Sequence, residues 1–119
     1  MSDRSVFIVE DRESISGAIQ DILEVKGMNV VGIASSAQEA LNMLNEIRAE
    51  IILMDILLPD GSGLDVAREI LIKDPEKKIV AMSATGDGSM RQRSLEAGCV
   101  EYLQKPFRMK EILEVLSSL

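Results

Sequence analysis

The stretch IILMDILLPDGSG, residues 51–63, joins a short apolar run to an abrupt break in the chain. Four apolar residues lead into the carboxylate of Asp55, and Pro59, Gly61 and Gly63 follow it. A continuous apolar run of this length is typical of a strand buried on both faces, and proline and glycine mark the turn that ends it. One acid at a strand end means little by itself, so its meaning depends on what stands at the ends of the other strands.

Short apolar runs of this kind recur along the chain and alternate with amphipathic helical patterns. Five strands alternating with five helices predict an α/β fold, a doubly wound five-stranded parallel sheet with right-handed crossovers and helices on both faces. The helices follow from apolar residues at i, i+3 and i+4 spacing. The expected strands are residues 5–9, 29–34, 50–55, 78–83 and 100–103, and the expected helices lie around 15–23, 37–47, 64–71, 89–97 and from Pro106 onward.

Three signals mark where helices are expected to begin and end. Gly27 is expected to stop the first helix, because glycine accepts the left-handed backbone that commonly ends one. Ser36 and Glu39 have the spacing of a capping box, which predicts the start of the second helix. Pro106 is expected in the first turn of the last helix, where the missing N–H of proline costs no helical hydrogen bond.

The composition limits the classes of function. The chain of 119 residues has the size of one domain, and its net charge of −7 disfavours direct binding to nucleic acid. It contains no histidine, which excludes histidine as a general base, metal ligand or phosphoryl carrier on this chain. The single Cys99 is interpreted as a small buried thiol in a reducing, cytoplasmic compartment. No apolar run reaches membrane-spanning length, and no secretory leader is expected.

Polar residues stand at the ends of four of the five expected strands. The first strand ends in Glu10 and Asp11, the third in Asp55 and the fourth in Ser83, and the fifth leads into Lys105. The carboxyl ends of parallel strands meet at the edge of the sheet where ligands of doubly wound folds bind, so we expect these residues to converge. The second strand ends without a charged group, which suits a position at the side of the sheet.

The charges of this cluster suggest its chemistry. Three carboxylates packed together repel one another, and a hard divalent cation such as Mg²⁺ or Mn²⁺, together with Lys105, is the expected source of positive charge. With the hydroxyl of Ser83, such a site suits phosphoryl transfer, in which Asp55 attacks phosphorus in line. Each residue alone has a plainer interpretation as a solvated turn, a helix cap or a surface lysine. The prediction of a phosphoryl-transfer site therefore rests on the combination of these residues.

The motifs around these residues resemble the receiver domain of bacterial two-component response regulators. The resemblance rests on VFIVED (6–11), ILMDILLPDGSG (52–63), IVAMSA (79–84) and EAGCVEYLQKPF (96–107), and it covers nearly the whole chain. It implies the flavodoxin-like strand order 2-1-3-4-5. Residues 1–119 are accordingly interpreted as a single receiver domain, and whether it is free-standing or a piece of a longer regulator stays open.

The resemblance also implies a phosphoacceptor and its metal site. Asp55 is implied as the phosphoacceptor, and Lys105 as the partner of the phosphoryl group. Asp11 is implied as a direct Mg²⁺ ligand, Glu10 as a looser ligand or one acting through water, and the backbone carbonyl of Leu57 as a further ligand.

A second group of residues is implied as the switch. The hydroxyl of Ser83 moves to the phosphoryl group and the ring of Tyr102 turns inward, while small Ala84 leaves the phosphoryl group room to enter. The bond between Lys105 and Pro106 is implied to be cis.

The implied function is a phosphorylation-driven switch rather than an enzyme. A sensor histidine kinase, a phosphotransfer protein or a small phosphodonor supplies the phosphoryl group, which favours a conformer that the domain already samples. The fourth helix, fifth strand and fifth helix form the expected readout face, which acts on an unknown output protein, an appended output domain or a second copy of the chain. Its charged residues, which equally suit a merely solvated face, are Arg91, Arg93, Glu101, Arg108 and Glu114.

The sequence departs from the family pattern in three places. Glu10 stands where aspartate is commoner, and GCVEY (98–102) replaces a more usual alanine–acid run. Leu57 and Thr85 lie two residues after Asp55 and Ser83, at positions that tune hydrolysis in this family. We expect the apolar Leu57 to hinder attacking water and to slow self-dephosphorylation.

Three other functions are weighed against the switch. A Mg²⁺-dependent phosphohydrolase of the haloacid dehalogenase type needs a second acid two residues after its nucleophile, where this chain has Leu57. A receiver that is never phosphorylated and serves only as a protein-binding scaffold is the second. The third is a flavin or nucleotide binder, but TGDGS (85–89) has neither P-loop nor dinucleotide spacing.

Overall fold

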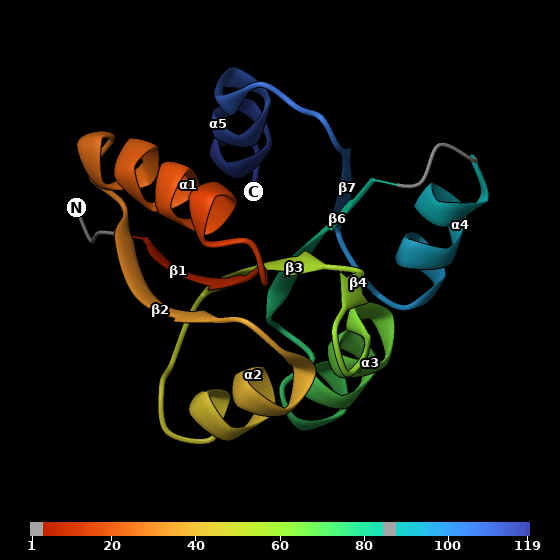
Figure 1. Ribbon diagram of the computed structural model, residues 1–119. Coiled ribbons are helices and arrows are strands. Elements are labelled where there is room, and N and C mark those ends of the chain that lie inside the picture. Colours follow the sequence, from red (N-terminus) through yellow and green to blue (C-terminus); the bar gives the residue numbers. More distant parts are fainter. Residues whose placement is uncertain (1–3, 85–87) are drawn as a thin grey trace.

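The computed structural model describes residues 4–84 and 88–119 and shows one central sheet covered by helices on both faces (Figure 1). The sheet strands are β1 (Ser5–Val9), β2 (Asn29–Ala34), β3 (Ile51–Asp55), β6 (Lys78–Ser83) and β7 (Glu101–Gln104). The helices are α1 (Glu13–Val25), α2 (Ala37–Leu44), α3 (Gly63–Lys73), α4 (Ser89–Glu96) and α5 (Met109–Ser117). Two short strands, β4 (Leu57–Leu58) and β5 (Gly61–Ser62), form an antiparallel hairpin between β3 and α3.

The order of the sheet is β2-β1-β3-β6-β7, which is 2-1-3-4-5 when only its own five strands are counted. Every neighbouring pair is parallel. The predicted doubly wound sheet is therefore confirmed, with the strand that lacks a charged end at one side. The carboxyl ends of β1, β3 and β6 lie next to one another, as the convergence of polar residues requires.

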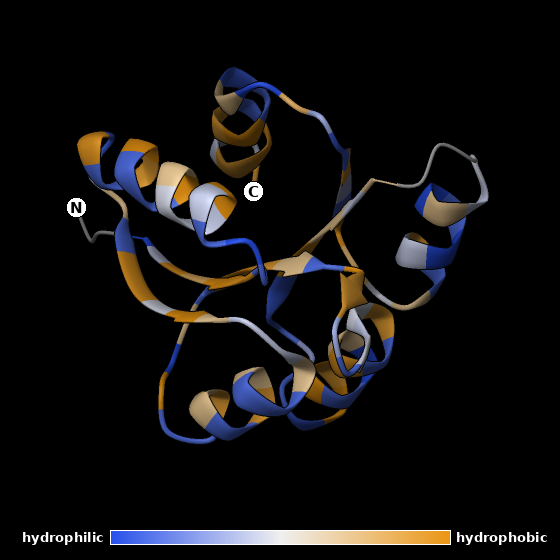
Figure 2. Cartoon of the chain, in the orientation of Figure 1, coloured by the Kyte–Doolittle hydropathy of each residue, from blue (hydrophilic) through white to orange (hydrophobic). Residues whose placement is uncertain are grey.

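The central strands are buried on both faces, so their side chains divide between two cores. On β1, Phe7 and Val9 pack with α2, α3 and α4, whereas Val6 and Ile8 pack with α1 and α5. This alternation follows from the two-residue period of a strand. Figure 2 shows the result, with apolar strands inside and helices whose polar sides face outward. The continuous apolar runs of the sequence thus arise from burial on two faces rather than from helical spacing.

The second helix confirms half of its predicted capping box. The hydroxyl of Ser36 accepts from the backbone N–H of Glu39 at 3.1 Å, but the Glu39 carboxylate accepts from the N–H of Ser35 at 2.6 Å. The helix ends at Leu44, before the expected residue 47. Ile47 nevertheless packs against the core, so its apolar spacing reflected burial beyond the end of the helix.

The start of the last helix differs from the prediction. Pro106 does not lie in the first turn, because α5 begins at Met109. The carboxylate of Glu111 accepts from the backbone N–H of Arg108 at 2.9 Å and caps the helix there. The Lys105–Pro106 bond is cis, as the resemblance implied. The first helix follows the prediction: it ends at Val25, and Gly27 has the left-handed φ of 85°.

Two further predictions concern the burial of Cys99 and membrane-spanning segments. Cys99 is buried, and burial raises the pKa of its thiol to about 11, which keeps the sulfur protonated and unreactive. Within residues 4–84 and 88–119, no helix has both the length and the apolar character needed to cross a bilayer.

Candidate functional site

Asp55 ends the central strand β3 and occupies the middle of the carboxyl edge of the sheet. It pairs in register with Met82 of β6, and the residue before it pairs with Val9 of β1. Only 5% of Asp55 is exposed. The carboxylate therefore stands between the ends of two neighbouring strands, at the bottom of a depression rather than on an open loop.

The chain turns sharply under Asp55, and this turn explains the last glycine of the opening stretch. The N–H of Gly63 donates to the carbonyl of Ile56 at 2.6 Å. A Cβ at position 63 would lie 2.1 Å from the backbone oxygen of Asp55, so any larger residue would push the acid out of place. Gly63 thus lets α3 begin directly beneath the site.

Lys105 links two of the acids. Its Nζ lies 2.5 Å from Oε1 of Glu10 and 2.9 Å from Oδ2 of Asp55, and its side chain is 15% exposed. Its backbone N–H donates to the carbonyl of Ser83 at 2.7 Å, which ties the β7–α5 connection to the end of β6. The predicted convergence of residues from positions 10, 55, 83 and 105 is therefore what the fold produces.

Burial and hydrogen bonding have opposite effects on the pKa values of Lys105 and Glu10. Burial tends to lower the pKa of Lys105, but its hydrogen bonds to Glu10 and Asp55 outweigh that effect and the pKa is raised. Burial raises the pKa of Glu10, and the hydrogen bond from Lys105 opposes the rise without cancelling it. The lysine is thus held in its charged form, and Glu10 accepts a proton more readily than an exposed glutamate.

The acids form a group with the composition of a cation site. One oxygen each from Glu10, Asp11 and Asp55 lies within 4.8 Å of the others. Both oxygens of Glu10 already accept hydrogen bonds, Oε1 from Lys105 and Oε2 from the N–H of Arg12 at 3.0 Å. Asp11 is exposed. Asp55 is held in the same way, with Oδ1 accepting from the N–H of Leu57 at 3.3 Å and Oδ2 accepting from Lys105. The donor set fits Mg²⁺, which prefers oxygen and takes one or two carboxylates.

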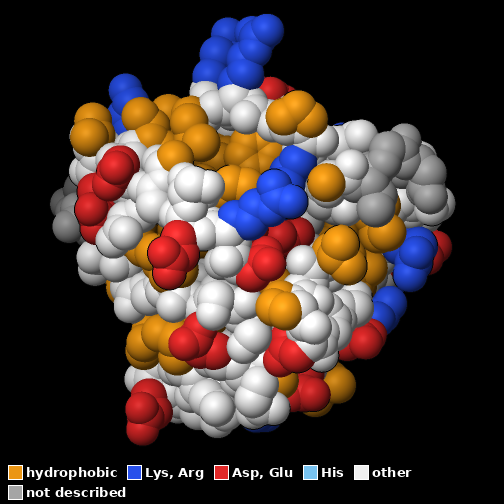
Figure 3. Space-filling view, viewed as in Figure 1, with side chains coloured by type: hydrophobic (Ala, Val, Ile, Leu, Met, Phe, Trp, Pro, Cys, Tyr) orange, Lys and Arg blue, Asp and Glu red, His pale blue; other side chains and the backbone are white. Residues whose placement is uncertain are grey.

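A pocket of about 630 Å³ opens over this group. Leu57, which is 74% exposed, and the exposed Ala84 line it together with Asp55 and Lys105. Apolar residues of α1 and of the β7–α5 connection, including Ile15 and Phe107, form the other side. Figure 3 shows acidic and basic side chains together at the centre of this face, beside a hydrophobic area. A phosphoryl group can therefore reach Asp55 from solvent.

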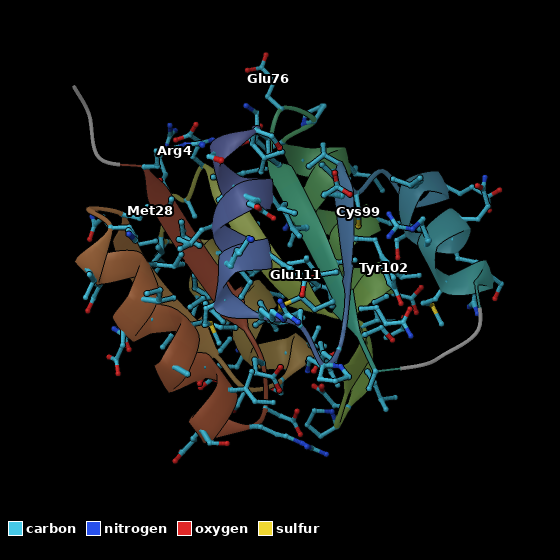
Figure 4. The ribbon with its side chains drawn as sticks, turned by 90° about the horizontal axis from the view of Figure 1, so that it is seen from above. Arg4, Met28, Glu76, Cys99, Tyr102 and Glu111 are labelled. Atoms are coloured by element: carbon cyan, nitrogen blue, oxygen red, sulfur yellow. The ribbon has the colours of Figure 1, made fainter. Side chains whose placement is uncertain are left out.

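The two expected switch residues lie on neighbouring strands. Ser83 ends β6 and is buried, and it pairs in register with Gln104 of β7, two residues after Tyr102. Tyr102 is only 5% exposed and belongs to the core on the α4 side of the sheet. Figure 4 shows it on β7, on the side toward α4. The ring therefore already lies inward in this structure.

Three contributors at or near the site were missed by reasoning from the sequence. Arg12 supports Glu10 through its backbone, Arg91 covers the ring of Tyr102, and Asp60 accepts from the N–H groups of Ala37 and Gln38 at the start of α2. Position 12 directly follows Glu10 and Asp11, so the sequence could have indicated that its backbone lies beside the acids. The other two contacts join residues far apart in sequence, and no motif marks them.

The roles predicted for the individual site residues stay predictions. The role of the Leu57 carbonyl as a metal ligand is one of them. Thr85, expected to tune hydrolysis, lies outside the described residues, as do Gly86 and Asp87 of the rejected nucleotide-binding stretch.

Known proteins of similar sequence or fold align with nearly the whole chain. The family model for the response regulator receiver domain matches residues 6–117. The chemotaxis protein CheY of Thermotoga maritima is 32% identical over 114 residues, which cover 96% of this chain and 95% of that protein. The response regulator GacA of Pseudomonas viridiflava is 29% identical over 93% of this chain and 52% of its own length. The crystal structure of a CheY-like receiver domain protein from Methanospirillum hungatei matches with a TM-score of 0.90 at 27% identity, covering 98% of this chain and 93% of that one.

Proposed function

The chain belongs to the response regulator receiver domain family, whose members are phosphoacceptor switches, and from this premise we propose that it is a phosphorylation-dependent switch with Asp55 as the phosphoacceptor. The single observation that carries the proposal is the geometry of Lys105, whose Nζ lies 2.5 Å from Glu10 and 2.9 Å from Asp55. A charged lysine beside a buried carboxylate on an otherwise acidic sheet edge is positioned to receive the phosphoryl oxygens.

The reaction follows from the placement of these side chains. One carboxylate oxygen of Asp55 attacks phosphorus and forms a P–O bond, while the bond from phosphorus to the leaving group breaks and the leaving group keeps the electron pair. The leaving group is an imidazole of a phosphohistidine or the acetate of acetyl phosphate. Lys105 then exchanges part of its contact with Asp55 for a phosphoryl oxygen, and the hydroxyl of Ser83 donates to another.

Magnesium, or manganese, fits the donor set of Asp11 and Asp55, and when bound it supplies positive charge opposite the phosphoryl oxygens. The Leu57 carbonyl is proposed as a further ligand. Because Oε1 of Glu10 accepts from Lys105 at 2.5 Å, Glu10 is proposed to support the site by holding Lys105 and to bind the cation loosely or through water.

The partners follow from the chemistry of the chain. Residues 1–119 have no histidine to carry a phosphoryl group, so the donor is a sensor histidine kinase or phosphotransfer protein, or a small phosphodonor. The output is a separate protein, an appended domain or a second copy of the chain, reached through α4, β7 and α5. The net charge of −7 disfavours direct binding of this domain to nucleic acid. Residues 1–119 are proposed to act as a single receiver domain in the cytoplasm.

A phosphohydrolase of the haloacid dehalogenase type is the alternative with a similar residue set. The position where such an enzyme needs its second acid is Leu57, an exposed apolar residue of the β4–β5 hairpin. Stable phosphorylation without rapid turnover is therefore the expected behaviour. Fast hydrolysis of generic phosphatase substrates would favour the alternative.

Incubation with acetyl phosphate and Mg²⁺, followed by intact-mass measurement, tests the proposal. The wild type is expected to gain the mass of one phosphoryl group, and Asp55→Asn is expected to gain none. Asp21→Asn is the matched control, because Asp21 is an exposed aspartate on α1 away from the site. A mass gain that survives in Asp55→Asn refutes the site assignment, and a wild type that never gains mass supports a scaffold without phosphorylation.

A further inference from the structure

The ring of Tyr102 lies inward, and this position carries a free-energy cost because the hydroxyl is buried with it. The residue is 5% exposed, and its hydroxyl is buried without a hydrogen-bond partner among the residues that the structure describes. Burying a hydroxyl in this way is unfavourable, because the group gives up its hydrogen bonds to water. Packing of the ring in the apolar core favours the inward position, and a contact that covers the ring adds to that preference.

Arg91 of α4 provides such a contact. Its guanidinium carbon lies 5.2 Å from the centroid of the Tyr102 ring, within the range of an attractive cation–π contact. The side chain of Arg91 is 59% exposed, so it covers the ring from the solvent side and keeps its charge in water. The ring is thus enclosed between the core of the domain and a cation.

Glu101 holds this guanidinium in place. Its Oε1 lies 3.7 Å from Nη1 of Arg91 and accepts from the backbone N–H of Tyr102 at 3.2 Å. One carboxylate oxygen therefore connects the guanidinium to the backbone of the residue whose ring that guanidinium covers. An exposed ion pair of this kind contributes little energy by itself, and its effect here is to orient Arg91.

The helix that carries Arg91 is weakly anchored. Within α4 only Ser94 is buried, whereas α3 buries five of its residues. A helix with few buried side chains shifts at low free-energy cost. A displacement of α4 would withdraw Arg91 from the ring, and an outward ring would remove a contact that holds α4.

We propose that Arg91 is a latch that holds Tyr102 inward and couples the position of α4 to the position of this ring. The coupling is reciprocal: whatever moves α4 changes the inward population of Tyr102, and the reverse holds by linkage. The use of this latch in signalling rests on the function proposed above, whereas the latch itself does not require phosphorylation.

Acrylamide quenching of tyrosine fluorescence tests the latch in the unphosphorylated, metal-free protein. Tyr102 is the only tyrosine and the chain has no tryptophan, so the emission reports on this ring alone. Arg91→Ala is expected to raise the ratio of outward to inward ring about two- to fivefold, which increases the quenching constant. Arg91→Lys, which keeps the charge, and Glu101→Gln, which frees the guanidinium, are expected to give smaller increases.

Arg93→Ala is the matched control, because Arg93 is exposed on the same helix but two residues away and therefore on another side. Arg91→Met separates charge from simple coverage and is expected to behave like Arg91→Ala. The proposal is wrong if Arg91→Ala and Arg93→Ala quench alike, if Arg91→Met protects the ring as well as arginine does, or if the wild-type ring is as accessible as in the urea-unfolded chain. Far-ultraviolet circular dichroism of each variant shows that the fold is retained. Because no phosphodonor is present, these outcomes are independent of whether Asp55 accepts a phosphoryl group.

Discussion

Lys105 donates hydrogen bonds to two buried carboxylates, those of Glu10 and Asp55. Without a bound metal ion, we therefore expect this one side chain to supply most of the positive charge that stabilises the site. Its position could be predicted, because strand ends of a parallel sheet converge. Its contact with Glu10 as well as Asp55 could not, because it depends on how the buried side chains are oriented in the folded structure. Glu10 was implied as a loose metal ligand or one acting through water, and the structure adds its ion pair with Lys105.

Replacing this lysine has a pH-dependent cost. Lys105→Met leaves Glu10 and Asp55 buried without their cation, and we expect a loss of roughly 3–5 kcal/mol at neutral pH, as for other broken buried pairs. The raised pKa of Glu10 means that this acid is neutralised early as the pH falls toward 4.5, so the difference from wild type shrinks there. The raised pKa of Lys105 means that the wild-type advantage persists up to pH 10.5 and is lost only above it.

Urea unfolding in EDTA, at neutral pH and near pH 4.5, measures the difference in the free energy of unfolding between Lys105→Met and wild type. Lys110→Met is the control, since Lys110 is exposed on α5. A Lys105→Met protein as stable as wild type at neutral pH would contradict the account of the ion pair.

We expect Leu57 to limit the access of water to the proposed phosphoryl group. The side chain is 74% exposed and lines the same pocket as Asp55. Leu57→Asn is expected to shorten the lifetime of the phosphorylated state, because the amide orients water that leucine excludes. Loss of label after removal of excess acetyl phosphate gives this lifetime, and an unchanged or longer lifetime in the variant would disprove the hypothesis.

Among the elements, α2 depends on a residue outside itself. The carboxylate of Asp60, which follows the β4 strand, accepts from the N–H groups of Ala37 at 2.7 Å and Gln38 at 3.0 Å. These hydrogen bonds lower the pKa of Asp60. The sequence shows only the local cap, Ser36, because a cap supplied from more than twenty positions away has no local pattern.

Asp60→Ala is expected to loosen the first turn of α2. The hydrogen bonds favour the ionised acid, so their contribution is present above pH 3.8 and is lost as the pH falls through the lowered pKa. At neutral pH we therefore expect a lower melting temperature and faster hydrogen exchange at Ala37 and Gln38. Asp21→Ala, at an exposed site on α1, serves as the control. Equal exchange in wild type and Asp60→Ala would show that this cap is not formed in solution.

Element boundaries separate what local patterns predict from what packing decides. The strands at residues 5–9, 29–34 and 78–83 were predicted to the residue, because β-branched runs and flanking turns mark them. The start of α5 was misplaced by three residues, because Arg108 and Glu111 cap it after Pro106 rather than before. The β4–β5 hairpin was seen only as a turn, since two-residue strands leave no period to detect.

For the molecule as a whole, the order of the sheet and its two cores decide where chemistry can occur. The fold was predictable because every strand and helix repeats one pattern, and the cluster of Glu10, Asp55 and Lys105 was predictable from that fold. The placement of Arg91 over Tyr102 was not, because it depends on how α4 packs against β7. The sequence therefore predicted which residues form the site, but it did not predict the contacts between side chains around it, such as that of Arg91 with Tyr102.

The central claim is that Asp55 takes up phosphorus beside a cation held by its neighbours. Borohydride reduction of the phosphorylated chain, followed by peptide sequencing in a mass spectrometer, tests it most directly, because the hydride converts an aspartyl phosphate into homoserine at the modified position. The account predicts conversion at position 55 alone, in reactions with Mg²⁺ and not in reactions with EDTA. Conversion at Asp11 or Asp60, or at position 55 to the same extent without a divalent cation, would contradict it.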